Sequence, residues 1–187
     1  MENDNVEENF HIYKVPGNKL SKASTDLITN TFLGGFASKE FKNMSTTDKM
    51  YYVRGIKEYI QDKNKIWYMV YSDFGKIISI IALIENPLTN NQGRVNPSFQ
   101  YELQAITTSP KYRGKGFVKD LISYICKTLD KAGLWLEVNE NNPAMKAYKK
   151  LGFEIYEEIP QKEEEEEELE TYEEGQEGKR FKMIMLC

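Results

Sequence analysis

A turn rich in glycine and basic residues is the part of the sequence best suited to chemistry. It spans residues 110–117 and contains the order Arg113-Gly114-Lys115-Gly116, between a strand-like segment and an amphipathic helical segment. Glycine lets the backbone approach a ligand closely, and the first N–H groups of a helix have no internal partner and carry the positive end of its dipole. The turn is therefore typical of a phosphate site, although Arg113 and Lys115 also suit a solvated surface.

Two other phosphate-binding motifs fit this turn less well. A Walker loop ends in Gly-Lys-Ser/Thr, whereas Gly116 is followed by Phe117. A dinucleotide fingerprint needs a third glycine where Lys119 stands, even though Glu137 lies at a suitable distance downstream. We exclude the first motif and keep the second as a minor alternative, beside a surface turn without a ligand.

A second segment downstream makes the turn more specific. It contains Asn141-Asn142-Pro143-Ala144, then Tyr148, then Leu151-Gly152-Phe153. Together with the turn it resembles the GCN5-related N-acetyltransferase (GNAT) family over about residues 100–158. The family pattern is Arg/Gln-x-x-Gly-x-Gly/Ala, then a strand, then an Asn-x-x-Ala-x-x-x-Tyr-x-x-x-Gly-Phe helix.

The resemblance implies an enzyme that takes the acetyl group from acetyl-coenzyme A (acetyl-CoA) and transfers it to a primary amine of a small molecule, peptide or protein. No metal is expected. Backbone groups before the turn would pair with the pantetheine arm, and the turn would hold the diphosphate. The implied cofactor-binding residues are Ile106, Thr107, Thr108, Arg113, Gly114, Lys115, Gly116, Phe117, Val118, Asn141, Asn142 and Tyr148.

The chain departs from the family pattern at two points. Val118 stands where the family has a final Gly or Ala, and its bulk is expected to weaken the grip on the diphosphate. Pro143 comes one residue sooner before the tyrosine than is usual in the family. The cofactor-facing asparagine is therefore Asn141 if the spacing of the family pattern decides, or Asn142 if the position of the helix cap decides. Asn142 before a proline is also a good helix N-cap, and this purely structural role stays open.

The resemblance also implies catalytic roles. Tyr148 matches the tyrosine that protonates the leaving thiolate, with packing of an aromatic ring as its alternative. Glu102, eleven residues before Arg113, matches the general base of the histone-acetyltransferase branch, and a solvent-facing strand glutamate is its alternative. Glu137 is the reserve base. Strand alternation puts Gln104 on the same face as Glu102, so Gln104 is a candidate substrate contact.

The spacing of apolar residues predicts the elements that position these groups. Helical spacing begins near Leu20 and is stopped by Gly34-Gly35, and Ser45 with Asp48 predicts a capped second helix with an apolar stripe that includes Met50. A further helix is predicted from Gly116 to Gly133 and a short one over residues 143–150. Strands are predicted over residues 10–15, 66–71, 77–85, 98–108, 134–139, 153–158 and 179–187.

These elements favour an α/β (α+β) fold with a mostly antiparallel mixed sheet flanked by helices. One parallel crossover joins the strand at 98–108 to the strand at 134–139 through the long helix. The resemblance adds that this parallel pair is splayed. We expect an acidic tail over residues 1–9 and a single domain over 10–187 with an acidic loop at about 159–178.

Composition and charge narrow the function further. The formal net charge is -4, with acidic residues gathered in the tail and in Glu163–Glu168, so no basic face for nucleic acid is expected. The longest apolar stretch, Ile77–Ile84, is shorter than the roughly 20 residues that span a bilayer, and the N-terminus lacks a secretory pattern. We expect a cytoplasmic monomer or homodimer without membrane association.

The remaining reactive residue types give weaker signals. Cys126 and Cys187 lack metal-ligand spacing and are expected to be reduced thiols, and His11 is expected to be an ordinary strand residue. The acidic loop is either a solvated segment without a ligand or a segment that attracts a cationic acceptor. Two alternatives to the enzyme are a non-catalytic acyl-CoA-binding sensor and an acidic interaction protein.

Overall fold

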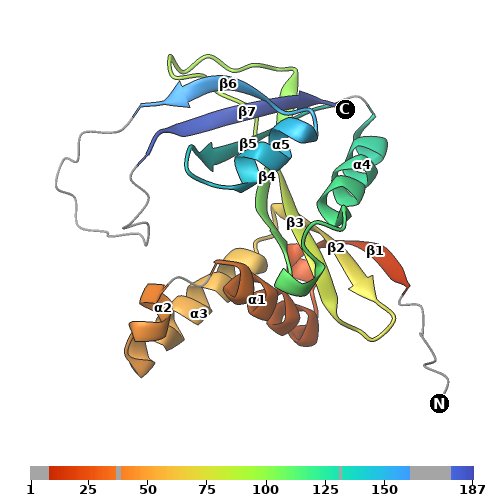
Figure 1. The fold of residues 1–187 in the computed structure, drawn as a ribbon, viewed down its shortest axis with the longest axis vertical. Coiled ribbons are helices and arrows are strands. Elements are labelled where there is room, and N and C mark those ends of the chain that lie inside the picture. Colours follow the sequence, from red (N-terminus) through yellow and green to blue (C-terminus); the bar gives the residue numbers. More distant parts are fainter. Residues whose placement is uncertain (1–8, 37–38, 131, 161–177) are drawn as a thin grey trace. The chain divides into compact units, whose positions relative to one another are not determined.

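The computed structural model describes residues 9–36, 39–130, 132–160 and 178–187 (Figure 1). The acidic segments at residues 1–8 and 161–177 lie outside the described residues. The helices are α1 (Lys22–Phe36), α2 (Lys39–Asn43), α3 (Thr46–Ile60), α4 (Phe117–Leu129) and α5 (Ala144–Lys150). The strands are β1 (Phe10–Pro16), β2 (Lys65–Ser72), β3 (Ile77–Glu85), β4 (Phe99–Thr108), β5 (Gly133–Asn139), β6 (Glu154–Ile159) and β7 (Arg180–Leu186).

The strands form a seven-stranded sheet in the order β1-β2-β3-β4-β5-β7-β6. The pairs β1–β2, β2–β3, β5–β7 and β6–β7 are antiparallel, and β4–β5 is parallel. The predicted mixed sheet with one parallel crossover is therefore confirmed, while the splaying of that pair stays a prediction. The chain divides into two compact units, residues 1–85 with 103–128 and residues 86–102 with 129–187, and the single-domain assignment also stays a prediction.

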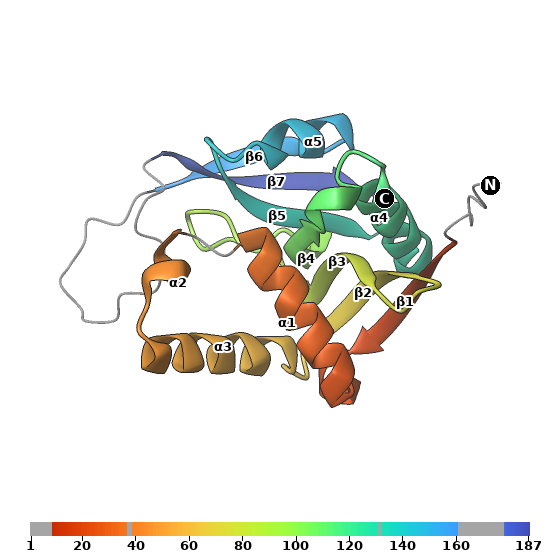
Figure 2. The same ribbon diagram turned by 60° about the horizontal axis from the view of Figure 1, so that its bottom comes forward.

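The first unit is built on the antiparallel strands β1, β2 and β3. Trp67 and Met69 of β2 point to the face that α1 and α3 cover (Figure 2), where Ile28 and Ile60 complete a buried cluster. Because side chains alternate along a strand, Tyr68 lies on the opposite face, where its ring meets that of Tyr124 in α4. The sheet of this unit is thus packed on both faces.

The predicted start of α3 is confirmed at the level of single hydrogen bonds. Ser45 Oγ accepts a hydrogen bond from the Asp48 N–H at 3.1 Å, which satisfies one of the free donors of the first turn. The predicted stripe is wrong at Met50, which is 70% exposed, while Ile56 and Ile60 are buried. The N-terminal half of α3 therefore contributes less to the core than its sequence suggested.

Three local predictions fail for identifiable reasons. The helix α1 continues through Gly34-Gly35 to Phe36, because glycine costs a helix only about 1 kcal/mol and does not forbid it. The helix α4 ends at Leu129, before Gly133, because Asp130 turns left-handed with a φ of 44°. Neither cysteine is a reduced thiol, since Cys126 and Cys187 are both disulfide-bonded.

The second unit has its own apolar centre. Leu88, Phe99 and Trp135 are buried together, with Tyr156 and Ile184 packed against them. The Trp135 indole N–H donates to the Asn86 carbonyl oxygen at 2.7 Å, which ties the loop before β4 to β5. None of the helices in the described ranges has the length and hydropathy of a membrane span.

Candidate functional site

The glycine-rich turn of the first unit leaves β4 through a defined set of backbone contacts. The Ser109 N–H donates to the Ile78 carbonyl oxygen at 2.8 Å, and Pro110–Tyr112 forms a short 3-10 turn. Arg113 then becomes extended, and its Nε donates to the Thr108 carbonyl oxygen at 3.2 Å. This bond bends the side chain of Arg113 back along the turn and holds the turn against the end of β4.

Gly114 and Gly116 have positive φ angles of 76° and 88°, a conformation that other residues adopt only with strain. A Cβ placed on either would meet no atom within 4 Å, so the space beside both glycines is open. Lys115 is exposed like both glycines. The backbone here is therefore accessible to a ligand.

The helix α4 begins directly after the second glycine. The Asp120 N–H donates to the Gly116 carbonyl oxygen at 3.1 Å, so the N–H groups of residues 117–119 have no partner within the helix. Together with the helix dipole they favour an anion. Asp120 in the first turn offsets part of this field, and Val118 is half-buried there.

Three aromatic rings fix the position of this helix start within the first unit. The Phe10 ring centroid lies 4.7 Å from that of Phe117 and 6.2 Å from that of Tyr112. The Lys111 and Lys115 ammonium groups lie 5.5 and 5.2 Å from the centre of the Tyr112 ring. The edge strand β1 thus contacts the turn through the Phe10 ring, and the two lysines place positive charge beside the turn.

The strand that leads to the turn carries a residue that the sequence analysis missed. Ala105 has a φ of 49°, which is strained for a residue with a Cβ and interrupts the extended backbone of β4. Beyond it, Ser79 Oγ donates to the Thr107 carbonyl oxygen at 3.0 Å, and Ile106 is half-buried. Alanine carries no sequence signal for a left-handed conformation, so Ala105 was not detectable from sequence.

The proposed base Glu102 belongs to the second unit and is only 9% exposed. Its Oε2 accepts a hydrogen bond from Asn86 Nδ2 at 2.7 Å. The alternative of a solvent-facing glutamate is therefore wrong. The reserve base Glu137 is exposed and forms an ion pair with Arg180 of β7, an arrangement typical of a cross-strand surface pair.

The two asparagines before α5 have different surroundings. Asn142 Oδ1 accepts a hydrogen bond from the Ala144 N–H at 2.9 Å, beside Pro143, which directly precedes α5. Asn141 is exposed and lies against Gly178, where a Cβ would come within 2.8 Å of its Nδ2. Asn142 thus has a structural contact at the start of α5, and the cofactor role of either asparagine stays a prediction.

Tyr148 is buried in the second unit, with its ring edge-on to that of Phe153 at 6.0 Å. Its carbonyl oxygen accepts hydrogen bonds from the Leu151 and Phe153 N–H groups, both at 3.0 Å, which fixes the chain after the helix. Burial raises the pKa of the Tyr148 hydroxyl to about 12. The side chain is therefore protonated at neutral pH.

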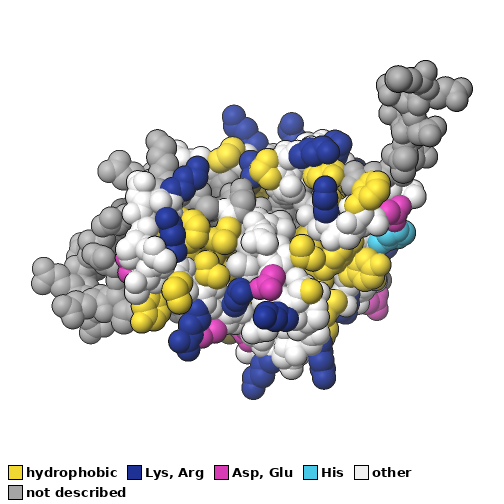
Figure 3. All heavy atoms as spheres, turned by 90° about the horizontal axis from the view of Figure 1, so that it is seen from below, with side chains coloured by type: hydrophobic (Ala, Val, Ile, Leu, Met, Phe, Trp, Pro, Cys, Tyr) yellow, Lys and Arg dark blue, Asp and Glu magenta, His cyan; other side chains and the backbone are white. Residues whose placement is uncertain are grey.

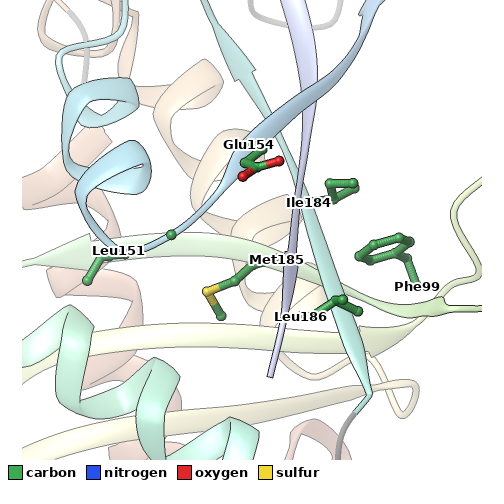
Figure 4. A pocket seen from close by; sticks show the side chains of 7 residues that line it. Phe99, Leu151, Glu154, Ile184, Met185 and Leu186 are labelled. Atoms are coloured by element: carbon green, nitrogen blue, oxygen red, sulfur yellow. The ribbon is translucent and has the colours of Figure 1, made fainter.

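Two surface cavities lie apart from the predicted site residues. One, of about 390 Å³, is in the second unit and is lined by Phe99, Leu151, Gly152, Glu154, Ile184, Met185 and Leu186 (Figure 4). The other, of about 550 Å³, is in the first unit beside Tyr13 and Tyr71. At its rim His11 Nε2 and Asp73 Oδ1 are 2.9 Å apart, and the histidine lies at the surface beside acidic side chains (Figure 3). Within the described ranges, no group of three or more His, Cys, Asp or Glu side chains is arranged to hold a metal ion.

The predicted residues thus fall into two groups. Ile106–Thr108 and Arg113–Val118 belong to the first unit, and Glu102, Asn141, Asn142 and Tyr148 belong to the second.

Several solved structures share this fold. PH1933 from Pyrococcus horikoshii is 18% identical, with a TM-score of 0.64 and 96% of this chain and 99% of that chain covered. The histone acetyltransferase HPA2 and related acetyltransferase from Corynebacterium glutamicum is 16% identical, with a TM-score of 0.62 and coverage of 92% and 94%. The spermidine/spermine N-acetyltransferase SpeG from Vibrio cholerae is 20% identical, with a TM-score of 0.56 and coverage of 95% and 92%. At these identities the likeness concerns the fold alone.

The sequence itself carries the family assignment. No curated protein matches it. Residues 35–153 match the model of the acetyltransferase (GNAT) family, and this range contains the turn, β4 and the helix with Tyr148. The protein therefore belongs to the GNAT acetyltransferase family and is an acyltransferase.

Proposed function

We propose that the protein is an N-acetyltransferase that transfers the acetyl group of acetyl-CoA to a primary amine. The observation that carries the proposal is the start of α4, where Gly114 and Gly116 are left-handed and the space beside them is open. Unpaired helix N–H groups and exposed basic side chains at such a turn suit a diphosphate. The residues present therefore fit the cofactor that this family uses.

The cofactor-binding set that we propose is the one expected from sequence, with one refinement. Arg113 to Val118 hold the diphosphate, and backbone groups of Ile106 to Thr108 bind the pantetheine arm. Asn141, which the spacing of the family pattern favours, is the cofactor-facing asparagine that we propose, and Asn142 Oδ1 accepts a hydrogen bond from the Ala144 N–H. The left-handed turn at Ala105 redirects the neighbouring backbone, and we assign the N–H that polarises the thioester carbonyl to this part of β4.

Catalysis requires three proton transfers. Glu102, directly or through a water molecule, takes one proton of the acceptor ammonium, so that the neutral amine nitrogen forms its bond to the carbonyl carbon, and Glu102 passes this proton to solvent. Tyr148 gives its proton to the sulfur as the carbon–sulfur bond breaks. The second proton leaves the nitrogen for solvent as the amide forms, and Tyr148 regains a proton from solvent. Tyr148 is protonated at neutral pH, as this role needs, while burial raises its pKa to about 12 and so makes the hydroxyl a weaker acid than an exposed tyrosine.

A cationic amine is the acceptor class that we propose to test first. The acidic run Glu163–Glu168, which lies outside the described residues, provides an attraction for positive charge. The likeness in fold to a spermidine/spermine N-acetyltransferase makes polyamines a reasonable first panel. Lys-rich peptides form the second panel. A cytoplasmic location and a monomeric or homodimeric state stay predictions.

The competing proposal is a sensor that binds acyl-CoA without catalysis, and the bulk of Val118 in the first turn of α4 favours it. Calorimetry with CoA, followed by thiol release from acetyl-CoA with each amine, separates the two. The enzyme is supported if CoA binding releases heat and if an amine causes thiol release that is strongly reduced in the Tyr148→Phe variant. Heat without thiol release for any amine supports the sensor, and absence of heat contradicts both.

A further inference from the structure

A hydrogen bond joins the end of α3 to the strained part of β4 within the first unit. Tyr59 Oη donates to Gln104 Oε1 at 2.9 Å, in partly buried surroundings. Gln104 directly precedes Ala105, whose φ is 49°. The bond spans 45 residues of sequence, and it links a core helix to the one described non-glycine strand residue with a positive φ.

Tyr59 is itself held from several sides. The Lys65 ammonium lies 4.0 Å from the centre of the Tyr59 ring, and the Lys65 side chain is only 8% exposed. Cation–π attraction is strongest when the cation is desolvated, as here. The Trp67 ring meets the Tyr59 ring edge-on at 6.3 Å, and the Trp67 indole donates to the Ile60 carbonyl oxygen at 2.8 Å. The Tyr59 hydroxyl is thus aimed at Gln104 before any ligand binds.

The Lys65 ammonium is fixed in turn by Asp62. The two groups form an ion pair at 3.2 Å, and Asp62 also accepts a hydrogen bond from the Asn64 N–H at 2.9 Å. The Asn64 N–H first, and the Lys65 ammonium second, lower the pKa of the Asp62 carboxyl. The support of Tyr59 therefore persists at neutral pH.

The Tyr59–Gln104 bond constrains the backbone at Ala105. A left-handed alanine persists only where its surroundings hold it, because an extended conformation is less strained. Anchoring the Gln104 side chain fixes the direction of its Cα–Cβ bond and so limits rotation of the peptide between Gln104 and Ala105. The bond is therefore suited to keep β4 in its interrupted form.

We propose that Tyr59 is a positioning residue for acetyl transfer, which acts through Gln104 to hold the Ala105 turn and the N–H groups beside it. The inference rests on the proposed N-acetyltransferase function. A residue that only stabilises the fold would affect the whole unit. A positioning role instead predicts an effect on the chemical step and on one backbone segment.

Steady-state kinetics provide the first test. Tyr59→Phe removes the hydrogen bond but keeps the ring, and we expect kcat to fall about tenfold with an unchanged KM for acetyl-CoA, because misplaced groups slow the chemical step. Gln104→Ala should lower kcat similarly, and the double variant should be no slower than Gln104→Ala alone, since both changes break one link. Tyr51→Phe is the matched control, because Tyr51 lies on the same helix and is 67% exposed.

Hydrogen exchange of backbone amides provides a second test that needs no activity. Tyr59→Phe and Gln104→Ala should speed exchange at residues 105–107 in the absence of ligand, while Tyr51→Phe should not. If the wild type acetylates no amine but this local change occurs, the proposed function fails and the link between Tyr59 and β4 stands. Unchanged exchange, an unchanged kcat in an active enzyme, or equally faster exchange throughout the unit overturns the inference.

Discussion

The side-chain amide of Asn86 donates a hydrogen bond to the carboxylate of Glu102, with 2.7 Å between Nδ2 and Oε2. Asn86 is anchored at the same time, because its carbonyl oxygen accepts a hydrogen bond from the Trp135 indole at 2.7 Å. Glu102 is only 9% exposed. One acidic side chain of the second unit is therefore both buried and oriented, as a base must be.

Replacing Glu102 with glutamine should remove the base while keeping the shape of the side chain. We expect kcat/KM for the amine to fall by about 10² to 10⁴, the usual contribution of general base catalysis, with an unchanged KM for acetyl-CoA. Steady-state kinetics with the amine and with acetyl-CoA as the varied substrate measure both constants.

Glu137→Gln is the matched control, because Glu137 is exposed and paired with Arg180. This change should alter kcat less than about twofold, as expected for a surface ion pair. A large loss in Glu137→Gln with normal activity in Glu102→Gln would reassign the base to the reserve candidate.

Alanine at Gly116 should weaken both the fold and the binding of CoA. The φ of 88° is strained for any residue with a Cβ, so the free energy of unfolding should fall by about 1 to 2 kcal/mol. The methyl group would also enter the open space beside the helix start, and the Kd for CoA should rise several-fold. Urea unfolding and calorimetry check the two effects.

Gly55→Ala serves as its control. Gly55 lies within α3, and a Cβ there meets no atom within 4 Å. Alanine favours a helix interior, so this variant should gain about 0.5 to 1 kcal/mol and bind CoA normally. Equal CoA binding by both alanine variants would show that the turn does not contact the cofactor.

Val118→Ala should strengthen the binding of CoA. Val118 is half-buried in the first turn of α4, where the family pattern has a small residue. Removing two methyl groups opens the approach to the helix N–H groups, and alanine is also the better helix former. We expect the Kd for CoA to fall about threefold or more by calorimetry. A weaker complex would mean that the valine side chain packs against the cofactor.

Tyr148 should make the folded protein sensitive to alkali. Its pKa is about 12 in the folded state and about 10 in an unfolded chain, so between these values the folded state binds more protons. The contribution of the protonated Tyr148 hydroxyl to the free energy of unfolding is complete below about pH 10. It is lost as pH rises towards 12, and the total loss is roughly 2 to 3 kcal/mol.

Urea unfolding of the wild type and of Tyr148→Phe at pH 9, 10 and 11 tests this dependence. The difference in free energy of unfolding should shift in favour of the phenylalanine variant as pH rises. Tyr13→Phe, at a position that is 51% exposed, should keep a constant difference from the wild type. Parallel curves for Tyr148→Phe and the wild type would contradict the burial of the hydroxyl.

Residue types and spacing were sufficient to predict the elements whose signals are local. The cap at Ser45, the β2–β3 hairpin and the glycine-rich start of α4 each depend on residues a few positions apart, so spacing and residue type were sufficient. The family pattern then linked the turn to Tyr148. Local signals failed where other forces outweighed them, as at Gly34-Gly35, where the helix simply continues.

The surroundings of the chemical groups depend on contacts between segments that are far apart in the sequence. Asn86 meets Glu102 across 16 residues, Tyr59 meets Gln104 across 45, and Arg180 meets Glu137 across 43. Ala105 takes a strained conformation that its type disfavours. Burial, partner and strain are properties of chain segments brought together by folding, and periodicity along one segment carries no information about which distant segment will cover it.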